Sequence, residues 1–219
     1  MDLYDVMRST PAVREFTDDP LPDDVLHRIL DHARFAPSGG NRQGTRVVVV
    51  RDHGTRERIA ELNKPAVRRY VAQIRAGQSP WNPLEAPIPT AEEIAATDVP
   101  DHFTRPVLTA GAVLVVCVDL ALVAAMDQDL DRIGLISGAS VYPLVWNVLL
   151  AARNEGFGGT ITTMAVAQEP AVRELLGIPE QYAVAAVVPL GKPVKQLTRL
   201  KRHPVESFVT RERFDGEAF

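Results

Sequence analysis

The chain has 219 residues, of which 46% are hydrophobic and 24% charged, and its formal net charge is -4. This length suits one large domain with its own core better than two domains. The acidic balance argues against a nucleic-acid-binding protein, because binding to phosphate backbones requires a basic surface.

The sequence predicts neither a membrane protein nor a secreted one. Met1-Asp2-Leu3-Tyr4-Asp5 does not resemble a signal peptide, and the longest charge-free apolar run, about Leu108 to Val118, is too short to span a bilayer. The single cysteine, Cys117, lies inside that run, so we expect a buried core residue and not a nucleophile. These features predict a cytoplasmic protein.

The first third of the chain reads as helices and one buried strand. The clearest helix has Pro22 in its first turn, places Leu26 and Ile29 on its apolar face, and ends at Pro37. A strand covered on both faces is predicted for Val47 to Val50, which is apolar throughout. Further helices are predicted for Leu3 to Met7, for Thr55 to Leu62, and from Pro65 to Ala76.

From Gly77 to Pro106 the periodic pattern is interrupted by prolines, apart from a possible helical turn at Ala91 to Ala95. Irregular segments of this length are uncommon in compact domains unless they are functional or disordered. We therefore expect a long excursion or a lid. Its Trp81 would either cover a ligand or anchor the excursion to the core.

The second half contains a helix that is apolar on both sides and ends at Asn154. Val145 and Val148 lie on one stripe and Trp146 on the opposite one, so the helix is expected at the centre of the fold or at a subunit interface. Pro143 predicts a kink in it. The other predicted elements are buried strands at Ala112 to Asp119 and Ala183 to Pro189, a helix from Val166 to Leu176, a basic linker from Lys192 to Arg202, and a tail without clear period from Val205 to Phe219.

The loop from Ala36 to Gln43 has the composition of a binding site. It follows the helix that ends at Pro37, its two glycines permit close approach of a ligand, and its donors are Ser38, Asn41, Arg42 and Gln43. These residue types suit a polar, anionic small molecule. Ordinary turn chemistry is the alternative interpretation.

Several sequence blocks, taken in order, resemble the FMN-dependent nitroreductase family. They are Arg8-Ser9, Arg14-Glu15-Phe16, Ala36 to Gln43 with the strand after it, Gly138 to Pro143, Ala151 to Gly158, Arg173 to Glu180, Pro189 to Pro193 and Lys201 to Glu206. The blocks cover most of the chain except about residues 63 to 106.

The resemblance implies an α+β fold: a three-layer sandwich with a central mixed, largely antiparallel sheet flanked by helices. It also implies a domain-swapped homodimer built around the central helix, with flavin at the interface. We expect one domain over residues 1 to 219, with the excursion at about 77 to 106 and a tail at about 205 to 219 that reaches the partner subunit.

The resemblance also implies which residues bind FMN. The phosphate is assigned to Arg8 and Ser9 together with Lys201 and Arg202, the latter pair from the second subunit. The ring and ribityl chain are assigned to Arg14, Ser38, Asn41 and Gln43, with Pro37 and Gly39 in the same loop. A backbone N–H near Thr162 and Thr163 is expected to point at flavin N5.

Two departures from the family pattern bear on FMN binding. Thr10-Pro11-Ala12 stands where many members have Arg-Arg-Ser, so a phosphate-binding arginine and hydroxyl are missing and Arg199 is expected to help compensate. Gly44-Thr45 replaces the usual Pro-Trp and removes an aromatic packing group.

The implied activity is that of an FMN-dependent NAD(P)H oxidoreductase with ping-pong kinetics, acting on nitroaromatic, quinone-like or other small acceptors. The chemistry would take place on the flavin, without a catalytic protein residue. The five histidines are scattered singly, so no metal site is predicted. The alternatives are a dehalogenating, flavin-degrading or deazaflavin-using relative, and a non-enzymatic flavin-binding protein.

Overall fold

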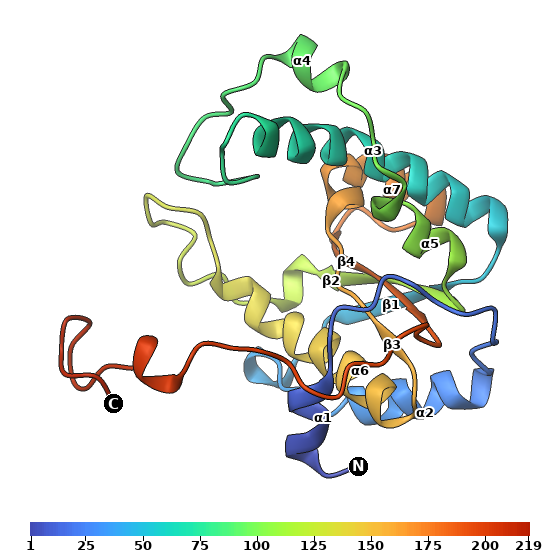
Figure 1. The fold of residues 1–219 in the computed structure, drawn as a ribbon, viewed down its shortest axis with the longest axis horizontal. Coiled ribbons are helices and arrows are strands. Elements are labelled where there is room, and N and C mark those ends of the chain that lie inside the picture. Colours follow the sequence, from blue (N-terminus) through green and yellow to red (C-terminus); the bar gives the residue numbers. More distant parts are fainter.

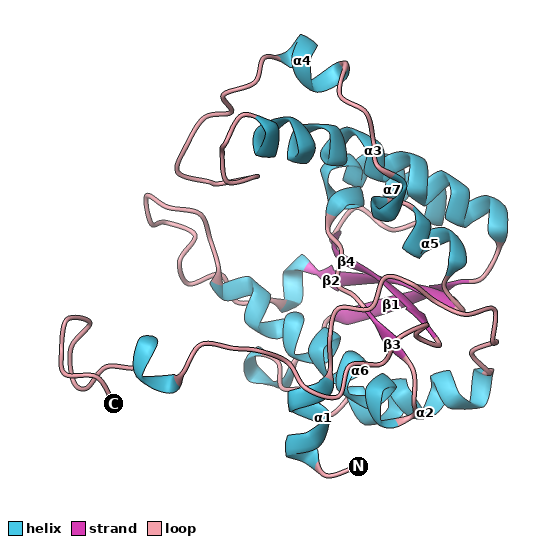
Figure 2. Ribbon diagram, viewed as in Figure 1, coloured by secondary structure: helices cyan, strands magenta, loops and turns pink.

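The structure is a computed structural model that describes all 219 residues. Its centre is a four-stranded antiparallel sheet with the order β1-β2-β4-β3 (Figure 2). A single bridge between Ala12 and Gly159 is parallel. The three predicted strands are confirmed, but the prediction that the strand at Val47 to Val50 is covered on both faces is wrong, because this strand lies at the edge of the sheet and Val49 is 42% exposed. The strands are β1 (Thr45–Val50), β2 (Ala112–Asp119), β3 (Gly158–Gly159) and β4 (Tyr182–Gly191).

Helices cover both faces of the sheet (Figure 1), which confirms the predicted three-layer α+β sandwich. One layer contains α1 (Leu3–Ser9), α2 (Asp23–Ala33) and α6 (Tyr142–Asn154). The other contains α3 (His53–Arg75), α5 (Arg105–Thr109) and α7 (Glu169–Leu176), with α4 (Ala91–Ala95) outside α3. Short 3-10 segments are η1 (Gly39–Asn41), η2 (Asp101–Phe103), η3 (Leu120–Leu122), η4 (Ile136–Ser140), η5 (Met164–Gln168) and η6 (Val205–Ser207).

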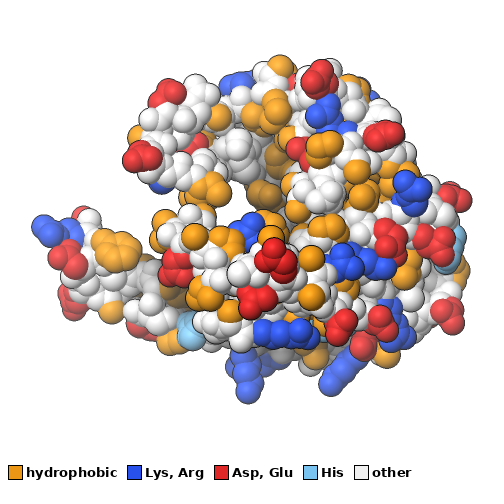
Figure 3. Space-filling model, turned by 90° about the horizontal axis from the view of Figure 1, so that it is seen from above, with side chains coloured by type: hydrophobic (Ala, Val, Ile, Leu, Met, Phe, Trp, Pro, Cys, Tyr) orange, Lys and Arg blue, Asp and Glu red, His pale blue; other side chains and the backbone are white.

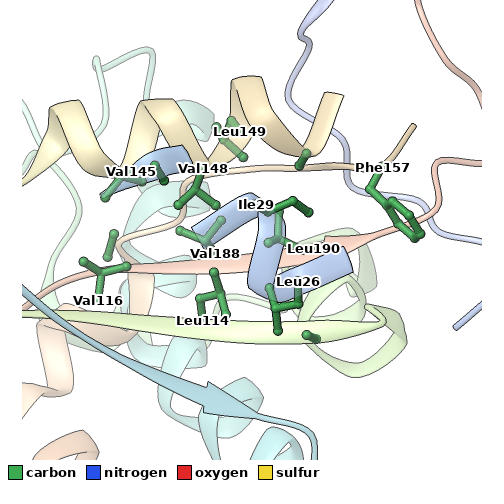
Figure 4. Close-up of a cluster of buried hydrophobic side chains, with 14 of the residues drawn as sticks. Leu26, Ile29, Leu114, Val116, Val145, Val148, Leu149, Phe157, Val188 and Leu190 are labelled. Carbon is green, nitrogen blue, oxygen red and sulfur yellow. The ribbon is translucent and has the colours of Figure 1, made fainter. Parts of the chain in front are cut away.

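Strand β2 explains the three layers, because every one of its residues from Ala112 to Val118 is buried. Leu114 and Val116 join the core beneath α2 and α6, whereas Val113 and Val115 join the core beneath α3 and α7. Figure 4 shows the first of these cores, where side chains of α2 and α6 converge on β2 and β4. Each fully buried valine or leucine contributes about 1.5–3 kcal/mol, so these two cores stabilise the fold.

A β-bulge in β4 inserts Ala185 into the ladder. Cys117 of β2 pairs with Val184, but the preceding residue of β2 pairs with Ala186. Side chains alternate along a strand, so the additional residue changes which face the rest of β4 presents. As a result, Val187 joins the same core as Val184.

The prediction that a helix begins at Pro65 is wrong, because Pro65 lies within the uninterrupted helix α3. A proline in a helix interior removes one backbone hydrogen bond and costs about 3 kcal/mol. The helix nevertheless continues, since Ile59 and Val67 on either side are completely buried. Tertiary packing outweighs the local preference here.

Two further predictions about helices are wrong. Pro143 lies in the first turn of α6, where no intrahelical hydrogen bond is lost, so α6 has no proline kink. The preceding residues form the separate segment η4. The helix predicted from Val166 begins only at Glu169, after η5, and has Pro170 in its first turn.

The excursion from Gly77 to Pro106 is ordered by two buried glutamines. Gln73, at the end of α3, is 0% exposed and donates from Nε2 to Gln78 Oε1 at 2.9 Å. The Gln78 Nε2 in turn donates to the carbonyl of Ala86 at 2.7 Å. The predicted helical turn is confirmed as α4. The excursion is thus a folded segment and not a disordered one.

Trp81 anchors this excursion. Its backbone N–H donates to Gln73 Oε1 at 3.1 Å, and the Arg69 guanidinium lies 3.9 Å from the centre of its indole ring. Its φ of 56° is unusual for a non-glycine residue. Of the two roles predicted for Trp81, these contacts support anchoring.

The tail from Val205 to Phe219 extends away from the sheet and its helices (Figure 1). It folds back on itself, with a bridge between Thr210 and Ala218, and its hydrogen bonds stay within residues 204 to 219. Phe208 and Phe214 are exposed. No helix of the chain combines the length and hydropathy that a membrane crossing requires.

Candidate functional site

Arginines from the two ends of the chain meet in one pocket. The backbone N–H of Leu200 donates to the Arg8 carbonyl at 3.0 Å, which holds the basic linker against α1. A pocket of about 540 Å³ is lined there by Met7, Arg8, Thr10, Trp146, Arg199, Leu200 and Arg202. Arg202 was predicted to serve a second subunit's site, but it lies beside Arg8 of its own chain.

The positive charge of this pocket is not neutralised. Arg8, Arg199 and Lys201 take part in none of the ion pairs of the structure. Arg202 donates from Nη1 only to the carbonyl of the neighbouring Lys201, at 2.7 Å. Guanidinium groups without carboxylate partners bind phosphate well. The pocket therefore suits an anion.

Ser9 holds the helix in place and does not face the pocket as a free donor. Its side chain is buried, and its hydroxyl donates to the Asp5 carbonyl at 2.6 Å. Arg153 of α6 donates from Nε to both the hydroxyl and the carbonyl oxygen of Ser9, at 3.1 Å each. Arg153 also lines a neighbouring pocket of about 520 Å³ with Arg8 and Arg199. Ser9 lines this neighbouring pocket as well, so its phosphate contact stays a prediction, and its hydrogen bonds give it a positioning role.

Arg14 lies in a different part of the same surface. It lines a pocket of about 180 Å³ with the segment Thr160 to Met164 and with three aromatic side chains, those of Tyr70, His102 and Phe103. The ring centres of Tyr70 and Phe103 are 5.4 Å apart, and those of His102 and Phe103 are 4.3 Å apart. This arrangement combines a cation with flat apolar walls.

The backbone of the segment from Thr160 to Met164 offers unused donors. Thr162 is committed to the sheet, since it exchanges two backbone hydrogen bonds with Val187, at 2.9 and 2.8 Å. By contrast, no hydrogen bond within the chain uses the backbone N–H of Thr163 or Met164. Of the two threonines predicted to face the flavin, only Thr163 therefore has an available N–H.

A fourth pocket, of about 590 Å³, extends from Arg14 along the N-terminal segment. Its lining includes the cations Arg105 and Lys195 and the acids Glu15 and Asp101. Of these residues, only Glu15 lies in a block that the sequence analysis quoted, and none was assigned to the site. His102 and Arg105 lie at the end of the excursion, where no sequence period places a side chain relative to Arg14.

The loop from Pro37 to Gln43 is well defined but lies elsewhere. The Gly39 N–H donates to the Ser140 hydroxyl at 3.0 Å, and the Gln43 N–H donates to the Ser38 hydroxyl at 2.9 Å. Gly40, Asn41 and Gln43 all have positive φ values, of 60°, 53° and 51°. Such a backbone is uncommon for non-glycine residues and is often found at functional sites.

The structure does not bring this loop to Arg14 within one chain. The loop packs against η3 and η4, where a Cβ on Gly44 would meet the Leu122 Cβ at 2.8 Å, and its donors face solvent. This close packing leaves no room for a side chain at Gly44. Two groups of candidate residues thus exist: Arg8, Arg14, Thr163, Arg199 and Arg202 on one surface, and Pro37, Ser38, Gly39, Asn41 and Gln43 on another.

Comparison with known proteins relates these surfaces to a family. The family model described as the nitroreductase family matches residues 7–192. The chain belongs to the nitroreductase family. A NADH dehydrogenase of Thermus thermophilus is 30% identical to this family member over 204 residues, which are 90% of each protein. An iodotyrosine deiodinase of Nematostella vectensis is 23% identical over 210 residues, covering 95% of this chain and 74% of that protein.

Solved structures show the same fold. An oxidized iodotyrosine deiodinase bound to FMN and 3-iodo-L-tyrosine matches this nitroreductase-family chain with a TM-score of 0.69 at 20% identity, covering 97% of this chain and 99% of that one. An NADPH:FMN oxidoreductase from Vibrio harveyi complexed with NAD+ matches with a TM-score of 0.67 at 20% identity, covering 97% of this chain and 78% of that one. The predicted family and fold are confirmed.

Proposed function

We propose that this chain is an FMN-dependent oxidoreductase that takes electrons from NAD(P)H and passes them to a small organic acceptor. The observation that carries the proposal is the pair of unused backbone donors at Thr163 and Met164, in a pocket with the unpaired guanidinium of Arg14. Family membership and the FMN and nicotinamide named for the fold neighbours support this cofactor pair.

The residues present fit FMN. Its phosphate requires cations without competing carboxylates, which Arg8, Arg199 and Arg202 supply. Its flat ring requires apolar walls and polar donors along one edge, which Phe103 and Arg14 supply. In this proposal the cluster of arginines would compensate for the family arginine that Thr10-Pro11-Ala12 lacks.

Each of these groups has a separate task in the proposed mechanism. When bound, the flavin supplies the redox chemistry. Arg14 would bind the pyrimidine edge and stabilise negative charge that develops there, because a fixed cation in a partly enclosed site needs little reorganisation. The backbone N–H of Thr163 would orient the ring at N5. Donor and acceptor would use the same exposed face in turn, which predicts ping-pong kinetics.

A homodimer would complete this site. The loop with Ser38, Asn41 and Gln43 cannot reach Arg14 in one chain, so a second copy would have to bring it there. Tyr4 of α1 and Trp146 of α6 are exposed, and hydrophobic side chains also gather around a hollow on the face seen in Figure 3. Such an area is typical of a subunit interface. The domain-swapped tail and the cytoplasmic location stay predictions.

Reductive dehalogenation is the second candidate. It is favoured by the iodotyrosine deiodinases among the relatives and by the fold match over 97% of the chain. The same flavin site would serve both reactions, so the acceptor distinguishes them. Consumption of NAD(P)H with a nitroaromatic or a quinone would support the first function, and release of iodide from an iodinated phenol would support the second.

The decisive experiment is the visible spectrum of the purified protein with added FMN. We expect flavin absorbance to remain after removal of free FMN, and to bleach anaerobically with NADH or NADPH. Arg14→Gln should weaken FMN binding about tenfold, since one charge-assisted contact is worth about 1.5 kcal/mol. Arg58→Gln, on the exposed side of α3, is the matched control. A protein that cannot be reconstituted with FMN would refute the proposal.

A further inference from the structure

A cavity separate from the candidate flavin site lies at the far end of the sheet. It occupies about 430 Å³ where β1 and β4 begin and β2 ends, next to the end of α7. Its lining includes Arg46, Val48, Cys117, Leu176, Ile178 and Tyr182. None of these residues lines the pockets around Arg8 or Arg14. The cavity is therefore a distinct site.

The course of the backbone explains why this space is not filled. Helix α7 ends at Gly177, whose φ of 63° turns the chain away from β1, and Pro179 then leads it into β4. Strand β1 is the edge of the sheet, so no strand of the same chain pairs with its outer side beside Val48. The walls are formed by β1, β2 and β4, by the end of α7 and by the short loop that joins α7 to β4.

The lining is mainly apolar, with one cation, Arg46, and one side-chain amide, that of Gln181. Cys117 is buried, and burial raises the pKa of its thiol to about 11, so it forms a neutral wall. Arg46 has neither a carboxylate within 4.0 Å nor another hydrogen-bond partner for its side chain. Small-molecule sites typically measure about 300–1,000 Å³ and combine apolar walls with a few polar groups. The cavity meets both conditions.

We propose that this cavity binds a small apolar carboxylate, with its hydrocarbon part between Val48, Leu176 and Tyr182 and its carboxylate on Arg46. The unpaired guanidinium favours an anion over a neutral compound, because a cation that gains a carboxylate forms a strong, directional pair. The apolar walls favour a hydrocarbon chain or ring over a sugar or a nucleotide. The proposal does not depend on the flavin function.

Octanoate is a suitable probe, and octanol is its neutral counterpart. Titration calorimetry on the full chain should show one octanoate site per chain, with the same affinity in the presence and absence of saturating FMN. Octanol should bind about tenfold or more weakly, since the contact between a carboxylate and a guanidinium is worth about 1.5–3 kcal/mol.

Three variants locate the site. Arg46→Gln should lower the affinity for octanoate to that for octanol. Leu176→Trp, which fills the cavity, should abolish octanoate binding. Arg58→Gln, another exposed arginine on a different element, should bind octanoate as the unmodified chain does. Folding of each variant is checked by its thermal transition. The proposal is overturned by absence of octanoate binding to the full chain, by competition with FMN, or by binding that survives both Arg46→Gln and Leu176→Trp.

Discussion

The excursion from Gly77 to Pro106 and the tail from Val205 to Phe219 both lack regular periodicity, yet they are organised in opposite ways. The excursion is tied to α3 by the buried side chains of Gln73 and Gln78. The tail forms hydrogen bonds only within itself and exposes its phenylalanines. An irregular segment can thus belong to its own domain through buried polar side chains, or remain available to another copy of the chain.

The largest expected effect concerns the tail. Replacing Phe208 and Phe214 by serine should convert a dimer into monomers and weaken FMN binding, because exposed aromatic side chains of this kind usually contribute to interfaces. Sedimentation velocity and flavin absorbance measure the two effects. Leu84→Ser, equally exposed but in the excursion, should leave both unchanged. A double variant that remains dimeric would show that the tail has no such role.

A smaller but substantial loss is expected for Gln73→Ala. The substitution leaves the Trp81 N–H without its partner, and an unsatisfied group of this kind costs about 1–3 kcal/mol. It also removes one of the two hydrogen bonds that Gln78 Oε1 accepts and leaves a cavity in place of a completely buried side chain. Denaturant unfolding should therefore show a loss of about 2–4 kcal/mol. The exposed Gln128→Ala is the matched control. Equal stability of the two variants would mean that the glutamines do not hold the excursion.

Asp127 provides an intermediate case, a loop held by one carboxylate. Asp127 accepts hydrogen bonds from the Leu135 N–H at 2.7 Å and from Arg132 Nη1 at 2.8 Å. The backbone N–H of Leu135 and the guanidinium of Arg132 lower the pKa of this carboxyl below its usual 3.8. Its contribution to stability is therefore present above pH 3.8 and is lost as the pH falls through the lower folded pKa.

Asp127→Asn should accordingly lower the thermal midpoint at neutral pH, and the difference from the unmodified chain should shrink as the pH falls below 3.8. Thermal scans at several pH values measure this. Asp129→Asn in the same loop, whose carboxylate has no hydrogen-bond partner, is the control. A difference that persists unchanged at low pH would contradict the ionic role of Asp127.

The smallest effect is expected at Trp81. Trp81→Leu retains an apolar side chain but removes the stacking on Arg69, which is worth about 0.5–1 kcal/mol at an exposed site. The loss should appear in the unfolding free energy, while FMN affinity stays unchanged. A marked change in FMN affinity would instead support the other role considered for Trp81, as a cover over a ligand.

The strands could be predicted from the sequence because the apolar runs at Val47, Ala112 and Ala183 depend on local pattern alone. The family could be predicted from the order of its blocks. The continuous helix through Pro65 could not be predicted, because long-range packing overrides the local cost of proline.

Part of the candidate site was also out of reach of sequence reasoning. Arg8, Arg14, Arg199 and Thr163 were named, but contacts such as those of Arg153 with Ser9 depend on how distant segments meet. His102 and Arg105 were missed for the same reason. The residue-level assignment to FMN stays a prediction.

The single inserted residue in β4 has a consequence for how this family member could change over time. Thr162 is held by two backbone hydrogen bonds to Val187. The side chain of Val187 faces the core beneath α3 and α7 only because Ala185 is inserted before it. Deleting Ala185 would invert every later side chain of the strand and detach the neighbouring N–H donors from their place beside Arg14. Deletion of this one residue, which lines none of the candidate pockets, would then abolish flavin binding and activity together, while the pairing of β1 with β2 remained.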